Sequence, residues 1–395
     1  MPKRNLKIVI LQILTAVILT AVLFIPAKKT MANSVALTII AGSKTYTFCD
    51  AEIGNYNGNF YLKNAKEIVD GIYLDTVIRP QNATLIFHKN MENPFTITKE
   101  KNGSMIDKLK LLSDVYSALN QSENELDFLG ENTHSSTLKK DKVVKAKFIE
   151  VKPKIKAEEL QKTVSLRAEF STAYPYSNSE RKHNILLATN KINGYILNPY
   201  EEFSFNKIVG LRTTENGYKT AKVILNGEYV DGVGGGVCQV STTLYNSALL
   251  AGMKITEQNS HSLLVQYVEP SFDAMVNSYT SDLRFVNTTN SPVYIVGEAN
   301  GTSLTFKIYG VEQLEKYQRV SVVMEDVLPE SPLIVNDETL LKGQSVVKVS
   351  EKKGAKSQGY LITYVNGERV KTELIRKDYY NALRGVILTA QDCTA

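Results

Sequence analysis

The most informative part of this 395-residue chain is residues 231–253, which read DGVGGGVCQVSTTLYNSALLAGM. Residues 240–250 predict a helix, and Gly252 lies just beyond its expected end. The glycines at 232 and 234–236 predict a loop that enters this helix, because glycine adopts backbone angles that other residues resist. The pattern therefore puts Cys238 at a helix N-terminus, two residues before the helix begins.

A cysteine at this position has a recognisable chemistry. A thiol is nucleophilic only as the thiolate, and a helix N-terminus lowers the thiol pKa through its dipole and free N–H groups. The same N–H groups can hold an oxyanion during acyl transfer. We therefore predict that Cys238 is a catalytic nucleophile, although a buried structural cysteine after a glycine-rich turn stays open. The residues expected to contact substrate or oxyanion are Gly234, Gly235, Gly236, Gln239 and Ser241.

A cysteine nucleophile also needs a base, and the chain has four histidines. His261 follows the predicted helix by one short turn and opens a predicted strand, so it can return beside the start of the helix. His183 is a reserve candidate. Asp273 or Asp282 could orient the base, as the third member of a catalytic triad does, and we predict Asp273. A purely structural His261 is the alternative. No Cys and His spacing suits zinc, so we predict neither a metal nor a cofactor.

The N-terminus predicts the compartment. Residues 8–27 form an apolar run, preceded by Lys3, Arg4 and Lys7. Such a run is just long enough to cross a hydrocarbon core of about 30 Å. The basic flank would stay in the cytoplasm, so the rest of the chain is expected outside it. A cleaved signal peptide and a retained signal anchor both fit, and Lys28 and Lys29 favour the membrane anchor over secretion to the cell wall.

Composition excludes several classes of protein. With 43% hydrophobic and 22% charged residues, the chain is neither disordered nor fibrous. Five of the 46 Lys and Arg residues lie in the first 33 residues, which hold no acid, so the rest of the chain is balanced and predicts no nucleic-acid partner. Of the three cysteines, Cys49 and Cys393 could pair only if the two ends of the exported part meet.

We predict an α+β chain of four parts. Residues 1–33 form the membrane segment, 34–168 an α+β spacer region, 169–312 a mixed α+β domain containing Cys238, and 313–395 a β-rich module. Further helices are predicted at 106–119, 153–165 and 184–192. Predicted strands lie at 35–40, 45–48, 84–88, 143–150, 222–225, 261–268, 281–287, 293–296 and 303–308.

Several blocks of the central region carry a family resemblance. They include Glu202 to Asn206 (EFSFN), residues 234–246 (GGGVCQVSTTLYN), His261-Ser262, Asp273-Ala274 and residues 282–287 (DLRFVN). Through these blocks residues 169–312 resemble a VanW domain. The C-terminal part resembles a G5 domain through residues 340–343 and 365–368. The part before the VanW-like region is similar to peptidoglycan-binding modules.

The VanW resemblance implies a bacterial peptidoglycan L,D-transpeptidase, an enzyme that forms 3-3 cross-links through a cysteine. Cys238 would then attack a tetrapeptide donor stem at the L-centre of diaminopimelate and expel D-Ala, with His261 as acid and base. The side-chain amine of diaminopimelate in a second stem would be the acceptor. Two alternatives stay open: an L,D-carboxypeptidase that uses the same thiol, and a non-catalytic cell-wall-binding or adhesion protein.

Overall fold

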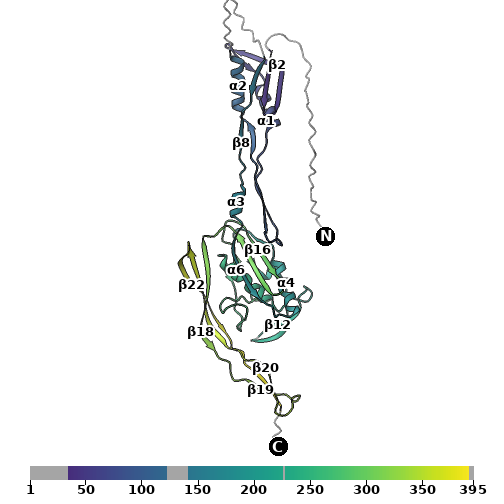
Figure 1. The fold of residues 1–395 in the computed structure, drawn as a ribbon, viewed down its shortest axis with the longest axis vertical. Coiled ribbons are helices and arrows are strands. Elements are labelled where there is room, and N and C mark those ends of the chain that lie inside the picture. The colour runs from purple at the N-terminus through teal and green to yellow at the C-terminus, as the bar shows by residue number, and fades with distance from the viewer. Residues whose placement is uncertain (1–33, 122–140, 226, 391–395) are drawn as a thin grey trace, which may run out of the picture. The chain divides into compact units, whose positions relative to one another are not determined.

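The computed structural model describes residues 34–121, 141–225 and 227–390 (Figure 1). The chain divides into two compact units. The described residues of the first unit are 34–78, 104–121 and 141–150, and those of the second are 79–103, 151–225 and 227–390.

The first unit is a small sheet covered by two helices. The sheet has the order β3-β2-β1-β7, in which β1 pairs with β2 antiparallel and with β7 parallel. Every second residue of β1 from Val35 to Ala41 is buried, which is the period of a strand with one face in a core. The elements are β1 Ser34–Ala41, β2 Lys44–Tyr56, β3 Asn59–Leu62, α1 Ala65–Thr76, β6 Gly103–Ile106, α2 Lys108–Asn120, β7 Lys142–Lys145 and β8 Phe148–Val151.

The central part of the second unit surrounds a buried helix. Helix α6 contacts β9 and β17 of the sheet β10-β16-β17-β9, and α4 contacts β16 of the same sheet. The central part contains three further sets of strands: β11-β15-β14, the β12-β13 hairpin and the β4-β5 hairpin. The elements are β4 Thr84–Phe87, β5 Phe95–Thr98, α3 Ala157–Lys162, β9 Ser165–Ala173, α4 Ser179–Ile192, β10 Tyr195–Leu197, β11 Glu202–Ser204, α5 Phe205–Val209, β12 Thr220–Leu225, β13 Glu228–Val233, α6 Val237–Leu250, β14 Lys254–Glu257, β15 Arg284–Val286, β16 Val293–Ala299 and β17 Ser303–Gly310.

Helix α6 is buried on every side, so its polar side chains need partners inside the protein. All its residues from Gln239 to Leu249 are buried. The Ser247 hydroxyl donates to the carbonyl of Phe306 at 2.7 Å, and Thr243 and Thr172 share a hydrogen bond of 2.8 Å. Such bonds offset the cost of burying polar groups, and they fix α6 in one position against the sheet.

The C-terminal part consists of two three-stranded sheets, β18-β21-β22 and β19-β23-β20. The first contacts the central part: the Arg319 guanidinium of β18 lies over the rings of Phe170 and Phe272, 4.4 and 4.6 Å from their centroids. The elements are β18 Glu315–Val327, β19 Leu333–Asn336, β20 Ser345–Val349, β21 Gly354–Val365, β22 Glu368–Tyr380 and β23 Val386–Thr389.

The predicted fold class is wrong in two respects. First, the described residues are mostly β, with 45% strand and 19% helix, rather than α+β. Many strands have only three or four residues, too few to show an alternating pattern in the sequence. Second, no helix in the described ranges is long and apolar enough to cross a membrane. The predicted span at residues 8–27 lies outside those ranges, and the structure does not support it.

Individual elements follow the predictions unevenly. The helix predicted at 240–250 is confirmed but begins at Val237, so Cys238 is its second residue rather than a residue before it. The strand predicted at 143–150 breaks into β7 and β8, and the helix predicted at 153–165 shortens to α3. The strand predicted at 261–268 is absent: the backbone N–H of His261 donates to the Asp273 carboxylate, and of this segment only Leu263 makes a β-bridge.

Packing around α6 gives a direct stability prediction. Leu244 of α6 is fully buried in the central core. We expect Leu244→Ala to lower the free energy of unfolding by about 2–5 kcal/mol, because the lost methyl groups leave a cavity. Leu186→Ala is the matched control on α4, where Leu186 is 43% exposed, and it should change stability by less than about 0.5 kcal/mol. Denaturant unfolding of both variants measures this, and equal losses would contradict the packing described.

Candidate active site

Three consecutive glycines shape the entry to α6. Gly234 and Gly236 have φ angles of 91° and 108°, in the region that favours glycine. Gly235 is required by space instead: a Cβ there would lie 2.6 Å from the backbone oxygen of Lys222 on β12. The loop therefore turns sharply and packs flat against β12. It delivers Cys238 to the first turn of α6, at the floor of a cleft of about 1000 Å³.

Two loop segments bring the other predicted residues to this helix. The segment 273–276 is held to α6 by Thr242, whose hydroxyl accepts from the Ala274 N–H at 2.9 Å, and by Ser241, whose hydroxyl donates to the Ala274 carbonyl at 2.6 Å. The Met275 N–H donates to the Asn259 carbonyl at 2.8 Å, which places the segment carrying His261 alongside. Segments that form no regular strand are thus positioned by side chains of α6.

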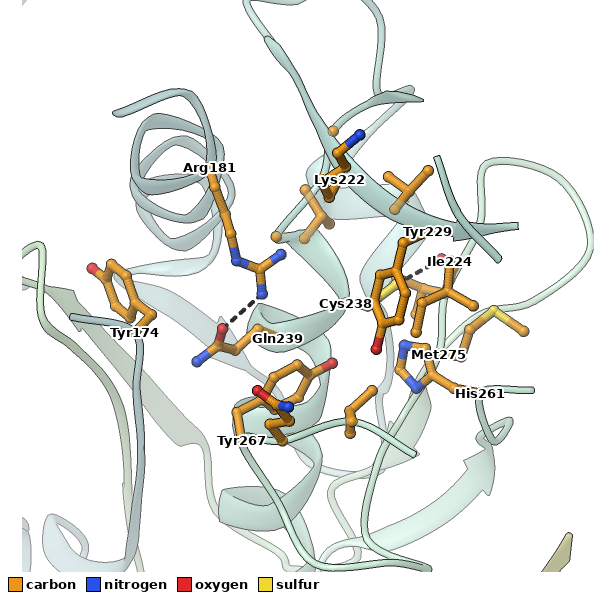
Figure 2. A pocket seen from close by; sticks show the side chains of 18 of the residues that line it. Tyr174, Arg181, Lys222, Ile224, Tyr229, Cys238, Gln239, His261, Tyr267 and Met275 are labelled. Carbon is orange, nitrogen blue, oxygen red and sulfur yellow. Dashed lines mark hydrogen bonds between the residues drawn. The ribbon is translucent and has the colours of Figure 1, made fainter. Parts of the chain in front are cut away.

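The structure brings Cys238, His261 and Asp273 together, and Figure 2 shows the first two of them. The Cys238 thiol donates to the carbonyl of Val276 at 3.2 Å, and His261 lies close enough to lower the pKa of that thiol. His261 Nδ1 lies 2.7 Å from Asp273 Oδ2, which also accepts the His261 backbone N–H at 2.6 Å. His261 is 6% exposed and Asp273 1%. A half-buried nucleophile, a buried base and a buried orienting carboxylate therefore form one chain of neighbouring side chains.

The electrostatics favour an ion pair in this chain. Burial raises the pKa of the Cys238 thiol, but the hydrogen bond and charge of His261 and the nearby Arg212 guanidinium lower that pKa below its ordinary value. Burial lowers the pKa of His261, whereas its hydrogen bonds to Asp273 and Cys238 raise it to about 9. Both shifts favour thiolate with imidazolium over the neutral pair, up to the pH at which His261 loses its proton.

The C-terminal sheet supplies the remaining partners of Asp273. The Tyr380 hydroxyl of β22 donates to Asp273 Oδ1 at 2.6 Å, and Arg376 Nη2 lies 3.4 Å from the same oxygen. Burial raises the pKa of Asp273, and His261 together with Arg376 and Tyr380 lowers it below its ordinary value. The Tyr380 oxygen also accepts the N–H of Ser271, whose φ is 66°. The C-terminal sheet thus holds both the charge and the backbone of the segment before Asp273.

Sequence reasoning missed these C-terminal residues. The C-terminal module carried no ionisable cluster when read along the sequence. Arg376, Asp378 and Tyr380 nevertheless alternate along β22, and Arg376 Nη2 also donates to Asp378 at 2.9 Å. Because every second residue of a strand lies on one face, this pattern was the available signal for a polar stripe.

Other residues singled out from the sequence lie elsewhere or have other partners. Gln239 donates to the Thr172 hydroxyl at 3.0 Å and to the Ala173 carbonyl at 3.1 Å, so its side chain anchors α6 to β9. His183 lies 2.9 Å from the carbonyl of Gly217 and does not line the cleft. Asp282 accepts from Ser204 at 2.6 Å, away from His261.

The remaining predictions concern cysteines and metals. Cys49 is exposed in the first unit and forms no disulfide with the other cysteine among the described residues, Cys238. Cys393 lies outside the described residues, so the structure does not describe a disulfide between Cys49 and Cys393. Among residues 34–121, 141–225 and 227–390, no group of three or more His, Cys, Asp or Glu side chains is arranged to hold a metal ion.

Three parts of the chain match known families. Residues 180–309 match VanW like protein, residues 319–387 match the G5 domain, and residues 35–127 match a peptidoglycan binding domain. The resemblances identified in the sequence are therefore confirmed. The match to a peptidoglycan binding domain associates the protein with the cell wall.

Two curated proteins share the central region. "Uncharacterized protein YoaR" of Bacillus subtilis is 40% identical over 151 residues, which cover 38% of this chain and 50% of that protein. "Vancomycin B-type resistance protein VanW" of Enterococcus faecalis is 28% identical over 149 residues, with coverage of 38% and 50%. The chain thus spans about half the length of these relatives. Among solved structures, the G5 domain of IgA1 protease is 19% identical over 20% of this chain and 90% of its own, with a TM-score of 0.15.

The buried chain predicts how His261 titrates. Asp273→Asn removes the carboxylate that stabilises the imidazolium, so the pKa of His261 should fall from about 9 towards the ordinary value of about 6.5. Asp282→Asn is the matched control, since Asp282 does not contact His261. NMR titration of labelled histidine measures both, and near-ultraviolet circular dichroism checks that each variant is folded. An unchanged His261 pKa in folded Asp273→Asn would contradict the assignment.

Proposed function

We propose that this protein is a cell-wall peptidoglycan L,D-transpeptidase that forms 3-3 cross-links through a Cys238 acyl-enzyme. The observation that carries the proposal is that Cys238 neighbours His261, which is hydrogen-bonded to Asp273, in the lining of an open cleft. This is the arrangement that activates a thiol for acyl transfer. The matches to VanW like protein and to a peptidoglycan binding domain support the wall as the source of substrate.

In the first step, the Cys238 thiolate attacks the carbonyl carbon at the L-centre of diaminopimelate in a tetrapeptide donor. A C–S bond forms and the bond from that carbon to the nitrogen of D-Ala breaks. The proton that the departing amine needs comes from the His261 imidazolium, which thereby becomes neutral. Asp273 binds Nδ1 of the ring throughout this transfer, so that Nε2 is the nitrogen left to exchange the proton.

The loop before α6 offers donors for the oxyanion of this step. Neither the Cys238 N–H nor the Gly236 N–H has an acceptor within the described part of the chain. Both lie at the N-terminus of α6, where the helix dipole favours negative charge. The side chains of Gln239 and Ser241 serve a different purpose in this proposal: they hold the helix and the segment 273–276 in register.

In the second step, the side-chain amine of diaminopimelate in an acceptor stem attacks the thioester. Neutral His261 takes a proton from that amine, a C–N bond forms, the C–S bond breaks and the thiolate returns. The chemistry exchanges one amide for another and needs no nucleotide. We assign this catalysis to residues 169–312, with residues 34–168 as a wall-binding spacer region and residues 313–395 as a G5-like module.

Product analysis tests the proposal. The full chain is incubated with disaccharide-tetrapeptide, and the protein and its muropeptide products are followed by mass spectrometry. We expect a donor adduct on Cys238 and 3-3 linked dimers, both lost in Cys238→Ala. Cys49→Ala is the matched control, because Cys49 is an exposed free thiol in the other unit, and it should retain both.

Other outcomes would replace the proposal. An adduct that yields only tripeptide would identify an L,D-carboxypeptidase, in which water is the acceptor. Neither adduct nor product, with the protein still sedimenting on cell walls, would identify a binding or adhesion protein with a structural Cys238.

A further inference from the structure

The cleft above Cys238 has a one-sided charge. Four cationic side chains line it: Arg181, Arg212, Lys222 and Lys352. No Asp or Glu is among the described residues that line it, although the chain as a whole holds 41 acids against 46 Lys and Arg. A cleft lined by one sign of charge concentrates ligands of the opposite sign.

Three of these cations already have partners or are covered. Lys222 pairs with Asp231 at 3.0 Å, and Lys352 lies over the Tyr229 ring, 4.7 Å from its centroid. Arg212 donates from Nη1 to the carbonyl of Gly210 at 3.0 Å, and its Nη2 is buried and has no hydrogen-bond partner among the described residues. Arg212 therefore acts on the charge of the nearby thiolate rather than on a ligand in the open cleft.

Arg181 differs because most of its donors stay available. Nη2 donates to Gln239 Oε1 at 2.9 Å, and this is its one side-chain hydrogen bond in the described part of the chain. A guanidinium has five N–H donors in a rigid plane, so this bond orients the group and leaves the others for a ligand. Figure 2 shows Arg181 extending from its helix into the cleft towards Gln239, with Tyr174 and Tyr267 labelled nearby.

Gln239 fixes this orientation independently of any ligand. Its amide nitrogen donates to the Thr172 hydroxyl and the Ala173 carbonyl, both of β9, so its Oε1 must be the end that faces Arg181. Gln239 is also the residue next to Cys238 along α6. The guanidinium is therefore held in one orientation in the cleft that Cys238 also lines, which is the preorganisation that two-point recognition of a carboxylate needs.

We propose that Arg181, oriented by Gln239, is a carboxylate-binding subsite that holds a free carboxylate of the donor peptide. The identification of the ligand as a stem peptide rests on the proposed function. The preference of the subsite for a carboxylate rests on the cationic lining of the cleft and the orientation of Arg181. A tetrapeptide donor has three free carboxylates: at its D-Ala terminus, on the side chain of diaminopimelate, and on the α-carbon of its γ-linked D-Glu. All three belong to the same chemical class, and donors amidated at one carboxylate at a time distinguish them.

The first test does not depend on catalysis. Cys238 is alkylated with iodoacetate, which is an anion, and with iodoacetamide, which is neutral, and peptide mapping gives the two rates. The ratio of iodoacetate to iodoacetamide rates should be higher at Cys238 than at exposed Cys49 of the same molecule. Arg181→Gln should lower the Cys238 ratio by about threefold or more. Lys182→Gln is the matched control, since Lys182 neighbours Arg181 on α4 but does not line the cleft.

A Cys238 ratio that is unchanged in Arg181→Gln would overturn the subsite, whatever the protein catalyses. An equal loss of the ratio in Lys182→Gln would also overturn it, because the effect would then be one of net charge alone.

The second test uses the donor. In Arg181→Gln, KM for the tetrapeptide should rise, whereas KM for a donor amidated at the carboxylate that Arg181 binds should stay the same. Amidating the D-Ala terminus, the diaminopimelate side chain and the D-Glu α-carboxylate in turn identifies which carboxylate that is. Equal rises of KM for the free and all three amidated donors would overturn the subsite. If the alkylation ratio at Cys238 falls in Arg181→Gln as expected but no donor is turned over, the proposed function would be overturned and the subsite would stand.

Discussion

The buried carboxylate of Asp273 is the interaction on which the rest of the site depends. One of its oxygens accepts two N–H groups of His261, and the other accepts the Tyr380 hydroxyl and lies beside Arg376. A carboxylate that is 1% exposed would be expensive to keep ionised without such partners. With them it stays charged, and its charge keeps the proton on His261 that in turn favours the Cys238 thiolate.

This arrangement makes the C-terminal sheet part of the site. Arg376 and Tyr380 come from β22, more than a hundred residues beyond Asp273 in the chain. Tyr380 also fixes Ser271 in a positive-φ conformation, and the Ser271 and Ser357 hydroxyls hydrogen-bond at 2.7 Å. The module that matches a G5 domain therefore determines the conformation and charge of the segment that orients His261. This role is additional to any ligand binding of the module itself.

Local sequence signals account for what was predicted, and contacts between distant segments account for what was missed. The glycine loop, α6 and Cys238 follow from φ preferences and helix periodicity within about twenty residues, and these were predicted. The pairing of His261 with Asp273 was predicted from residue type and order, although the strand expected at 261–268 does not form. Gln239 was expected to contact substrate, yet its side chain is bound to β9 and Arg181. Arg376 and Tyr380 were missed because their contacts with Asp273 join distant segments.

The central claim is that Cys238 is activated by His261, and its ionisation tests this most directly. In a Cys49→Ser, Cys393→Ser background, the ultraviolet absorbance of the thiolate reports Cys238 alone among the cysteines as pH is varied. The account predicts a midpoint below the ordinary thiol pKa of about 8.5, and a midpoint that moves upward in His261→Ala because the stabilising imidazolium is gone. A midpoint at or above the ordinary value, unaffected by loss of His261, would contradict it.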